Sequence, residues 1–356
     1  MMFSYQFPAI RGIQANSEYY ICMVPLKFLS RIFGENDEYV PPRFRAQRTL
    51  NLKRIPEIRD YILQNRDTYV FSALAASIGG DYEFKPIDNN NLGILYIDLD
   101  ATFLINDGQH RKAAIIRAIE IDETLKDETI SIVFYADKGL ERSQQMFTDL
   151  NKHAVNSTRS LNTSFDYRDP MAVLTKEVIS KIEFFDKYTD MESDNLGDNS
   201  PNLFTLSMFY DAISNTAKGL NIDDEDEREF IFEYWSEVEK NISVWQDLKE
   251  RLITKKCLKK EYIIVYGVAV LALGKLGNWL YFNNLDTYKN CLQGLRNVNW
   301  KRSNIKDWKN RAIKPNGQIS RSNGTINLTY IRLKKILGLA LTKDESDLDR
   351  DTSRKQ

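Results

Sequence analysis

Two kinds of hydrophobic pattern divide the chain near residue 160. Before this point, short runs rich in β-branched and aromatic residues alternate with helical segments. Such runs, bounded by Gly, Asn or Asp, are typical of strands. The predicted strands cover residues 19–26, 92–99, 102–107 and 129–136. The predicted helices cover residues 43–65, with an interruption at Pro56, and residues 112–121 and 140–154.

Beyond residue 160, apolar residues recur at intervals of three and four, which places them on one face of a helix. The predicted helices cover residues 171–187, 203–218, 227–252, 261–276, 285–298 and 329–339. Residues 190–201 (DMESDNLGDNSP) are polar and contain Gly and Pro, so they predict a loop. Residues 343–356 are almost all polar or charged, which predicts a disordered tail.

These patterns predict an α+β protein of two domains. Residues 1–160 form a small α/β domain in this interpretation, and residues 161–342 form an all-helical domain. A chain of 356 residues is also long enough for one hydrophobic core to give way to two.

The composition limits the partners and the compartment. Lys and Arg (49) nearly balance Asp and Glu (50), so any surface for nucleic acid must be local. Cys22, Cys257 and Cys291 are far apart and odd in number, which favours free thiols in the reducing cytoplasm. The start of the chain lacks the pattern of a secretory leader, and residues 262–273, the longest apolar run, are too short to span a bilayer. We therefore expect no membrane partner.

The segment INDGQHRKAA (residues 105–114) joins a predicted strand to a predicted helix. Gly108 permits close approach of a ligand, and the free N–H groups of the first helical turn favour an anion. His110 adds a titratable donor, and Arg111 adds a planar cation that can bind phosphate with two hydrogen bonds. Asp107 could cap the helix or hold a metal-bound water. Alternatively, these residues form only a capped turn and a solvated helix start.

The DGQHR element resembles the signature of the DGQHR-domain family that includes the DndB proteins. Its strand, Gly-x-x-Arg turn and helix are similar to the phosphate-binding box of the ParB and sulfiredoxin superfamily. The resemblance extends over residues 5–340 and includes residues 43–51 and 147–170. It implies a ParB/sulfiredoxin-like N-terminal domain that binds a nucleotide or phosphate.

The residue-by-residue comparison implies that the ligand is bound by Asp107, Gly108, Gln109, His110, Arg111 and Asn151. Gln109 stands where sulfiredoxins carry their catalytic cysteine, which excludes that thiol chemistry. Ala154 stands where ParB proteins carry a phosphate-contacting arginine.

The resemblance further implies a transcriptional repressor of a DNA phosphorothioation gene cluster. Its partners would be the double-stranded DNA of the promoter, other phosphorothioation proteins and a second copy of the chain. The alternative is an accessory nucleoside triphosphatase that uses ATP or another nucleotide with Mg²⁺. In that case Asp107 or His110 would assist water, and Arg111 would stabilise charge. A third hypothesis is an interaction scaffold whose acidic residues 223–229 bind a basic partner. No metal site made of protein ligands is predicted, because the chain has only two histidines.

A basic segment near the C-terminus is the main candidate for DNA contact. Residues 301–335 contain one acid, Asp307, against many cations, and they include Trp and Asn residues. The predicted contacts are Lys301, Arg302, Lys306, Lys309, Arg311, Arg321, Lys334 and Lys335, with a second patch at Arg43, Arg45 and Arg48. Alternatively, the segment is a solvated face balanced by the acids of residues 223–229. Lys255, Lys256, Lys259 and Lys260 are expected to flank helix ends.

Overall fold

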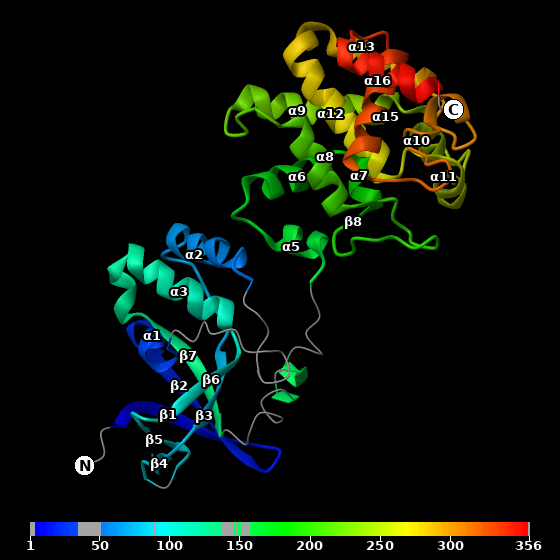
Figure 1. Ribbon diagram of the computed structural model, residues 1–356. Coiled ribbons are helices and arrows are strands. Elements are labelled where there is room, and N and C mark those ends of the chain that lie inside the picture. The colour runs from blue at the N-terminus through cyan, green and yellow to red at the C-terminus, as the bar shows by residue number, and fades with distance from the viewer. Residues whose placement is uncertain are drawn as a thin grey trace. The chain divides into compact units, whose positions relative to one another are not determined.

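A computed structural model describes residues 4–34, 51–88, 90–136, 145–146, 148–150 and 157–354. The chain forms two compact units, Met1–Val155 and Asn156–Gln356 (Figure 1). The first unit is built on a β-sheet, whereas helices dominate the second. The α+β class predicted from the sequence is therefore confirmed.

The sheet of the first unit has seven strands in the order β4-β5-β1-β2-β7-β3-β6. All neighbouring pairs are antiparallel except β3 and β7, which are parallel. The strands are β1 (Ser4–Gln14), β2 (Ser17–Pro25), β3 (Leu74–Gly79), β4 (Tyr82–Pro86), β5 (Leu92–Asp98), β6 (Thr102–Asp107) and β7 (Thr129–Ala136).

The sequence predicted four of these strands, β2, β5, β6 and β7, and missed the other three. β1 contains Pro8 and Gly12, and β3 reads LAASIG, so neither has the β-branched run on which the prediction relied. β3 is buried along nearly its whole length because it lies between β7 and β6. Burial between neighbours therefore overrides its weak strand propensity.

Helices α2 (Arg54–Gln64) and α3 (Gln109–Ile121) pack against each other in this unit (Figure 1). The unit also contains η1 (Leu26–Phe28), α1 (Leu29–Ile32) and η3 (Glu123–Asp127). The predicted interruption at Pro56 is wrong. Pro56 lies in the first turn of α2, where its missing N–H has no helical partner to lose. Of the helix predicted over residues 140–154, residues 145, 146 and 148–150 are described, and they are helical.

The second unit is built mainly from helices around one large hydrophobic core. They are α5 (Arg159–Phe165), α6 (Pro170–Lys181), α7 (Glu183–Tyr188), α8 (Leu206–Thr216), α9 (Glu225–Asn241), α10 (Ser243–Lys249), α11 (Lys255–Glu261), α12 (Gly267–Asn284), η4 (Leu285–Thr287), α13 (Tyr288–Gln293), η5 (Gly294–Asn297), α14 (Ile305–Trp308), α15 (Asn323–Ile336) and α16 (Lys343–Arg354). Helix α12 is the central element and is almost entirely buried over its first eight residues. It lies very close to α8, since a Cβ on Gly274 would be 2.1 Å from the carbonyl oxygen of Ala212.

Two expectations for this half are corrected by the structure. A short parallel pair, β8 (Thr189–Asp190) and β9 (Phe204–Thr205), interrupts the all-helical pattern. The predicted disordered tail is wrong, because residues 343–354 form helix α16 with Asp349 and Thr352 buried. Acids in the first turn favour this helix, and contacts with the rest of the unit hold it in place.

Candidate functional site

The DGQHR element forms the strand, turn and helix that the sequence predicted. β6 ends at Asp107 and α3 begins at Gln109, with Gly108 between them at φ +99°. A Cβ at Gly108 would be 2.3 Å from Cδ2 of Leu74. Both the left-handed backbone and the lack of space therefore require glycine at this turn.

Arg111 is already engaged within the protein. Its Nη1 donates to the carbonyl oxygens of Ser72 (2.6 Å) and Ala73 (3.0 Å), and its Nη2 donates to Oδ2 of Asp107 (2.6 Å). The Arg111 side chain is only 17% exposed. The guanidinium thus fastens α3 to the segment that leads into β3. A phosphate could reach it only by replacing some of these bonds.

His110 has a hydrogen-bond partner, whereas two other polar atoms beside the turn have none among the described residues. His110 accepts a hydrogen bond at Nε2 from the backbone N–H of Asn51 (2.9 Å). By contrast, Gln109 Nε2 and Asn106 Oδ1 are buried and have no hydrogen-bond partner among the described residues. Asn106 itself is fully buried, and its Nδ2 donates to Ser77 Oγ (2.7 Å). Buried polar atoms are usually paired, so these two atoms suggest that a water or a ligand group completes the turn.

Asn106 was not among the predicted ligand-binding residues. Only its position directly before the turn could have indicated a role. Asn151 was predicted to bind the ligand, but it lies outside the described residues. The predicted DNA contacts Arg43, Arg45 and Arg48 also lie outside them.

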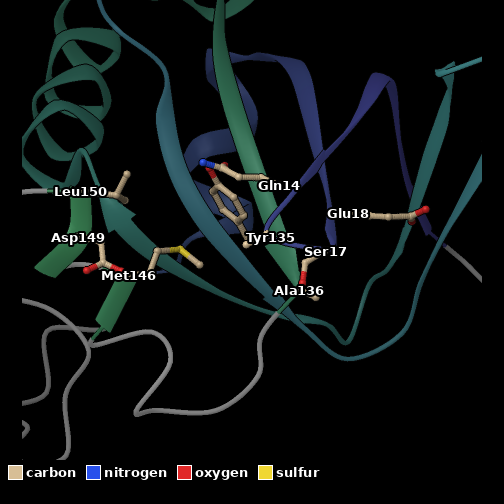
Figure 2. A pocket seen from close by; sticks show the side chains of 9 residues that line it. Gln14, Ser17, Glu18, Tyr135, Ala136, Met146, Asp149 and Leu150 are labelled. Atoms are coloured by element: carbon tan, nitrogen blue, oxygen red, sulfur yellow. The ribbon is translucent and has the colours of Figure 1, made fainter.

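A pocket of about 430 Å³ is lined by residues of β1, β2 and β7 and by residues 146, 149 and 150 (Figure 2), and the residues of the turn are not among its lining. Met146 connects the two places, because its sulfur lies 3.1 Å from Asn106 Nδ2. The charged groups that line the pocket are Glu18 and Asp149, which makes it unsuitable for a phosphate. The full lining is Gln14, Ala15, Ser17, Glu18, Tyr135, Ala136, Met146, Asp149 and Leu150.

In the second unit, helix α16 takes up part of the predicted basic segment. Arg311 donates to Asp349 (2.7 Å), and both side chains are 1% exposed. Lys334 is buried and donates to Glu345 (2.7 Å). The prediction that Arg311 and Lys334 contact DNA is therefore wrong, because acids of α16 bind both cations inside the unit.

The same helix neutralises Lys335, whose Nζ lies 2.7 Å from Asp349 Oδ2 while the side chain stays 52% exposed. Burial by itself raises the pKa of Asp349. The hydrogen bonds from Lys335 and Arg311 outweigh that effect, so the pKa of this carboxyl lies below its usual value.

Of the other cations, Arg332 is 12% exposed and pairs with Asp307, the single acid of the segment, while the rest remain at the surface. Lys301, Lys306 and Arg321 are exposed, while Arg302 and Lys309 are half-buried. Arg321 shares the Asp211 carboxylate with Arg159. The structure thus divides the segment into an internal part held by α16 and an external part.

The acidic run at residues 223–229 has a local structural role. Asp224 is the N-cap of α9 and accepts a hydrogen bond from the N–H of Glu227 (3.1 Å). Acids in the first turn stabilise a helix through its dipole. This role accounts for the charge run without a partner protein.

The described residues contain neither a metal site made of protein ligands nor a helix that could span a membrane. Within them, no three His, Cys, Asp or Glu side chains are grouped as a metal site requires. In the same part of the chain, no helix combines the length and apolar character of a membrane span.

The fold and these sites define an α+β protein with a glycine turn between a strand and a helix in one unit and a basic surface segment in the other. A family model described as DndB, DNA-sulfur modification-associated, matches residues 7–340. The chain therefore belongs to the DndB family, which associates it with DNA sulfur modification systems. Comparisons with curated proteins and with solved structures gave no match.

Proposed function

We propose that this protein is a DNA-binding transcriptional regulator that represses the gene cluster of a DNA phosphorothioation system. The observation that carries the proposal is the external part of the basic segment, in which Lys301, Lys306 and Arg321 are exposed. In a chain with a net charge of −1, binding to a polyanion depends on such a local surface.

A regulator also needs contacts that distinguish one sequence from another. Asn316 and Asn323 are exposed and belong to the same segment. Amide side chains can bind base edges, with adenine as the usual target. The cations would position the protein on the phosphate backbone, and the amides would contribute to sequence preference.

The test is a binding titration with the promoter of the protein's own gene cluster and a shuffled duplex of equal length, at several salt concentrations. Specific regulators bind their site roughly 10³-fold or more tightly than other DNA. Equal affinity for both duplexes would overturn the regulator proposal. If the affinity for both duplexes falls as the salt concentration rises, the protein still contacts the phosphate backbone.

A nucleoside triphosphatase that uses ATP or another nucleotide with Mg²⁺ is the second candidate. It is favoured by Gln109 Nε2, which is buried without a partner among the described residues and belongs to the first turn of α3, where N–H groups attract an anion. Asp107 or His110 would assist water, and Arg111 would have to leave its present partners to stabilise charge.

Phosphate release by wild type and by Arg111→Ala tests this second candidate. Loss of the cation should cost about a hundredfold in turnover. Gln109→Leu is the companion variant because it leaves the bonds of Arg111 in place, and it should weaken stabilisation by Mg-ATP in a thermal-shift assay. Equal phosphate release by all three proteins would exclude catalysis at this turn.

A further inference from the structure

Helix α11 and the segment at residues 300–302 lie side by side in the second unit. The N–H of Ile263 donates to the oxygen of Trp300 (2.9 Å), and the N–H of Arg302 donates to the oxygen of Glu261 (2.7 Å). Tyr262 and Lys301 form the antiparallel bridge between these bonds. Cations some forty residues apart in the sequence are thus brought to one place.

The result is a surface that we call the α11 basic face. It consists of Lys255, Lys256, Lys259, Lys260, Lys301 and Arg302. Two acids are close to it: Glu261 at the end of α11, and Asp198, which interacts with Lys259. The six cations and two acids leave a local excess of four positive charges.

The cations of this face form no ion pairs with acids of the described residues. None of the six forms an ion pair with another described residue, unlike Arg311 and Lys334 at α16. Crowded like charges repel one another, and this face lacks the internal acids that α16 supplies elsewhere. Its positive charge remains available to an external anion.

Several of these cations are nevertheless held in position. Lys259 Nζ donates to the carbonyl oxygens of Gly197 (3.1 Å) and Ser200 (2.9 Å). Lys301 Nζ lies 5.9 Å from the ring centre of Tyr262, and the Arg302 guanidinium lies 6.0 Å from that of Tyr266. Rings and carbonyl oxygens orient a cation without cancelling its charge. The face is therefore preorganised for a polyanion.

We infer that the α11 basic face binds the phosphate backbone of double-stranded DNA. The inference rests on the proposed DNA-binding function and specifies its surface. It adds the four lysines of α11, which the sequence suggested only as flanks of helix ends. Because lysines bind phosphates as point charges, this face should contribute affinity to any duplex and little sequence preference.

The experiment measures DNA affinity against salt for the full chain and for the double variant K260Q/K301Q. Both lysines are exposed and form no ion pair with a described residue, so the variant should fold with nearly unchanged stability, which thermal melting checks. The plot of log K against log salt has a negative slope, and each lost phosphate contact reduces its magnitude by about 0.9, so the magnitude should fall by about 1.8. The loss should be equal on promoter and shuffled DNA.

The control is K218Q/K289Q, in the same unit. Both lysines are exposed, and Lys289 pairs with Glu233 (2.9 Å). Lys218 and Lys289 lie near the C-terminal end of α12, where the Asn278 side chain donates to the backbone oxygen of Lys218 (2.7 Å). The α11 basic face lies by the N-terminal end of α12. This control should keep the wild-type slope.

The outcomes separate the two ideas. If wild type binds no DNA, the proposed function fails together with this inference. If wild type binds DNA and K260Q/K301Q keeps its slope, only the surface is wrong. If K260Q/K301Q instead loses binding to vesicles of anionic phospholipid while its DNA slope is unchanged, the face binds a membrane surface and the inference is overturned.

Discussion

Replacing Asp349 by Ala tests the attachment of helix α16 to the second unit. Asp349 accepts hydrogen bonds from Arg311 and Lys335, and the Arg311–Asp349 pair is excluded from water. The substitution would leave the Arg311 guanidinium buried beside a single remaining side-chain partner, Ser353 Oγ at 2.8 Å. An uncompensated buried charge is among the most destabilising defects in a protein.

The expected loss can be worked out from this geometry. Removal of one partner of a buried ion pair costs about 3–5 kcal/mol. For a unit of this size, 1 kcal/mol shifts the melting temperature by about 2–4 °C, so Asp349→Ala should lower it by roughly 6–20 °C. The matched control is Asp347→Ala on the same helix. Asp347 is 48% exposed and pairs with Arg350, so its loss should cost about 0.5 kcal/mol or less.

Chemical denaturation of both variants, with unfolding followed by tryptophan fluorescence, provides the measurement. Trp308, one of the buried tryptophans, lies three residues before Arg311 in this unit. A loss below about 1 kcal/mol for Asp349→Ala, no larger than for Asp347→Ala, would refute the reasoning. It would mean that α16 is frayed in solution, as its polar sequence suggested.

The pH dependence of stability gives an independent check on Asp349. Its pKa in the folded protein lies below the usual value of about 3.9, so its contribution to stability is complete above that pH. The contribution is lost as the pH falls through the folded pKa. Wild type should therefore lose more stability than Asp349→Ala between about pH 4 and pH 2.

Three further perturbations have definite expected results. Gly108→Ala should destabilise the first unit by about 2–5 kcal/mol in denaturant titrations, because the backbone at Gly108 is left-handed and the new Cβ would meet the Leu74 side chain. Gly197→Ala is the control and should have little effect, because a Cβ there would meet open space. Gly274→Ala should lower the melting temperature because its Cβ would meet backbone on α8, while Gly324→Ala, in the first turn of α15, should be neutral or stabilising. Burial and a hydrogen bond to the Asp169 carboxylate raise the pKa of Tyr210 to about 12. The stability that the neutral Tyr210 side chain contributes should therefore be lost as the pH rises from about 10 to 12. If Tyr210→Phe loses as much free energy of unfolding as wild type over this pH range, the prediction is wrong.

Local patterns were sufficient for much of the first unit. β6 and β7 have the predicted bounds, because β-branched and aromatic runs between turn residues leave few alternatives. The DGQHR turn also lies where the sequence placed it, since a glycine between a strand and a helix strongly restricts the backbone. β3 was missed because it depends on neighbouring strands for burial.

The sequence by itself determined the α+β class, the change of character near residue 160 and the position of the glycine turn, because these depend on neighbours a few residues away. Only the tertiary structure decided which cations face the solvent. Residues 301–335 read as one basic segment, yet Asp349 and Glu345 bind Arg311 and Lys334 internally, and Lys301 joins α11 through a backbone bridge. Charge composition is a property of the chain, whereas burial and ion pairing depend on contacts between distant segments, and only the folded unit makes those contacts.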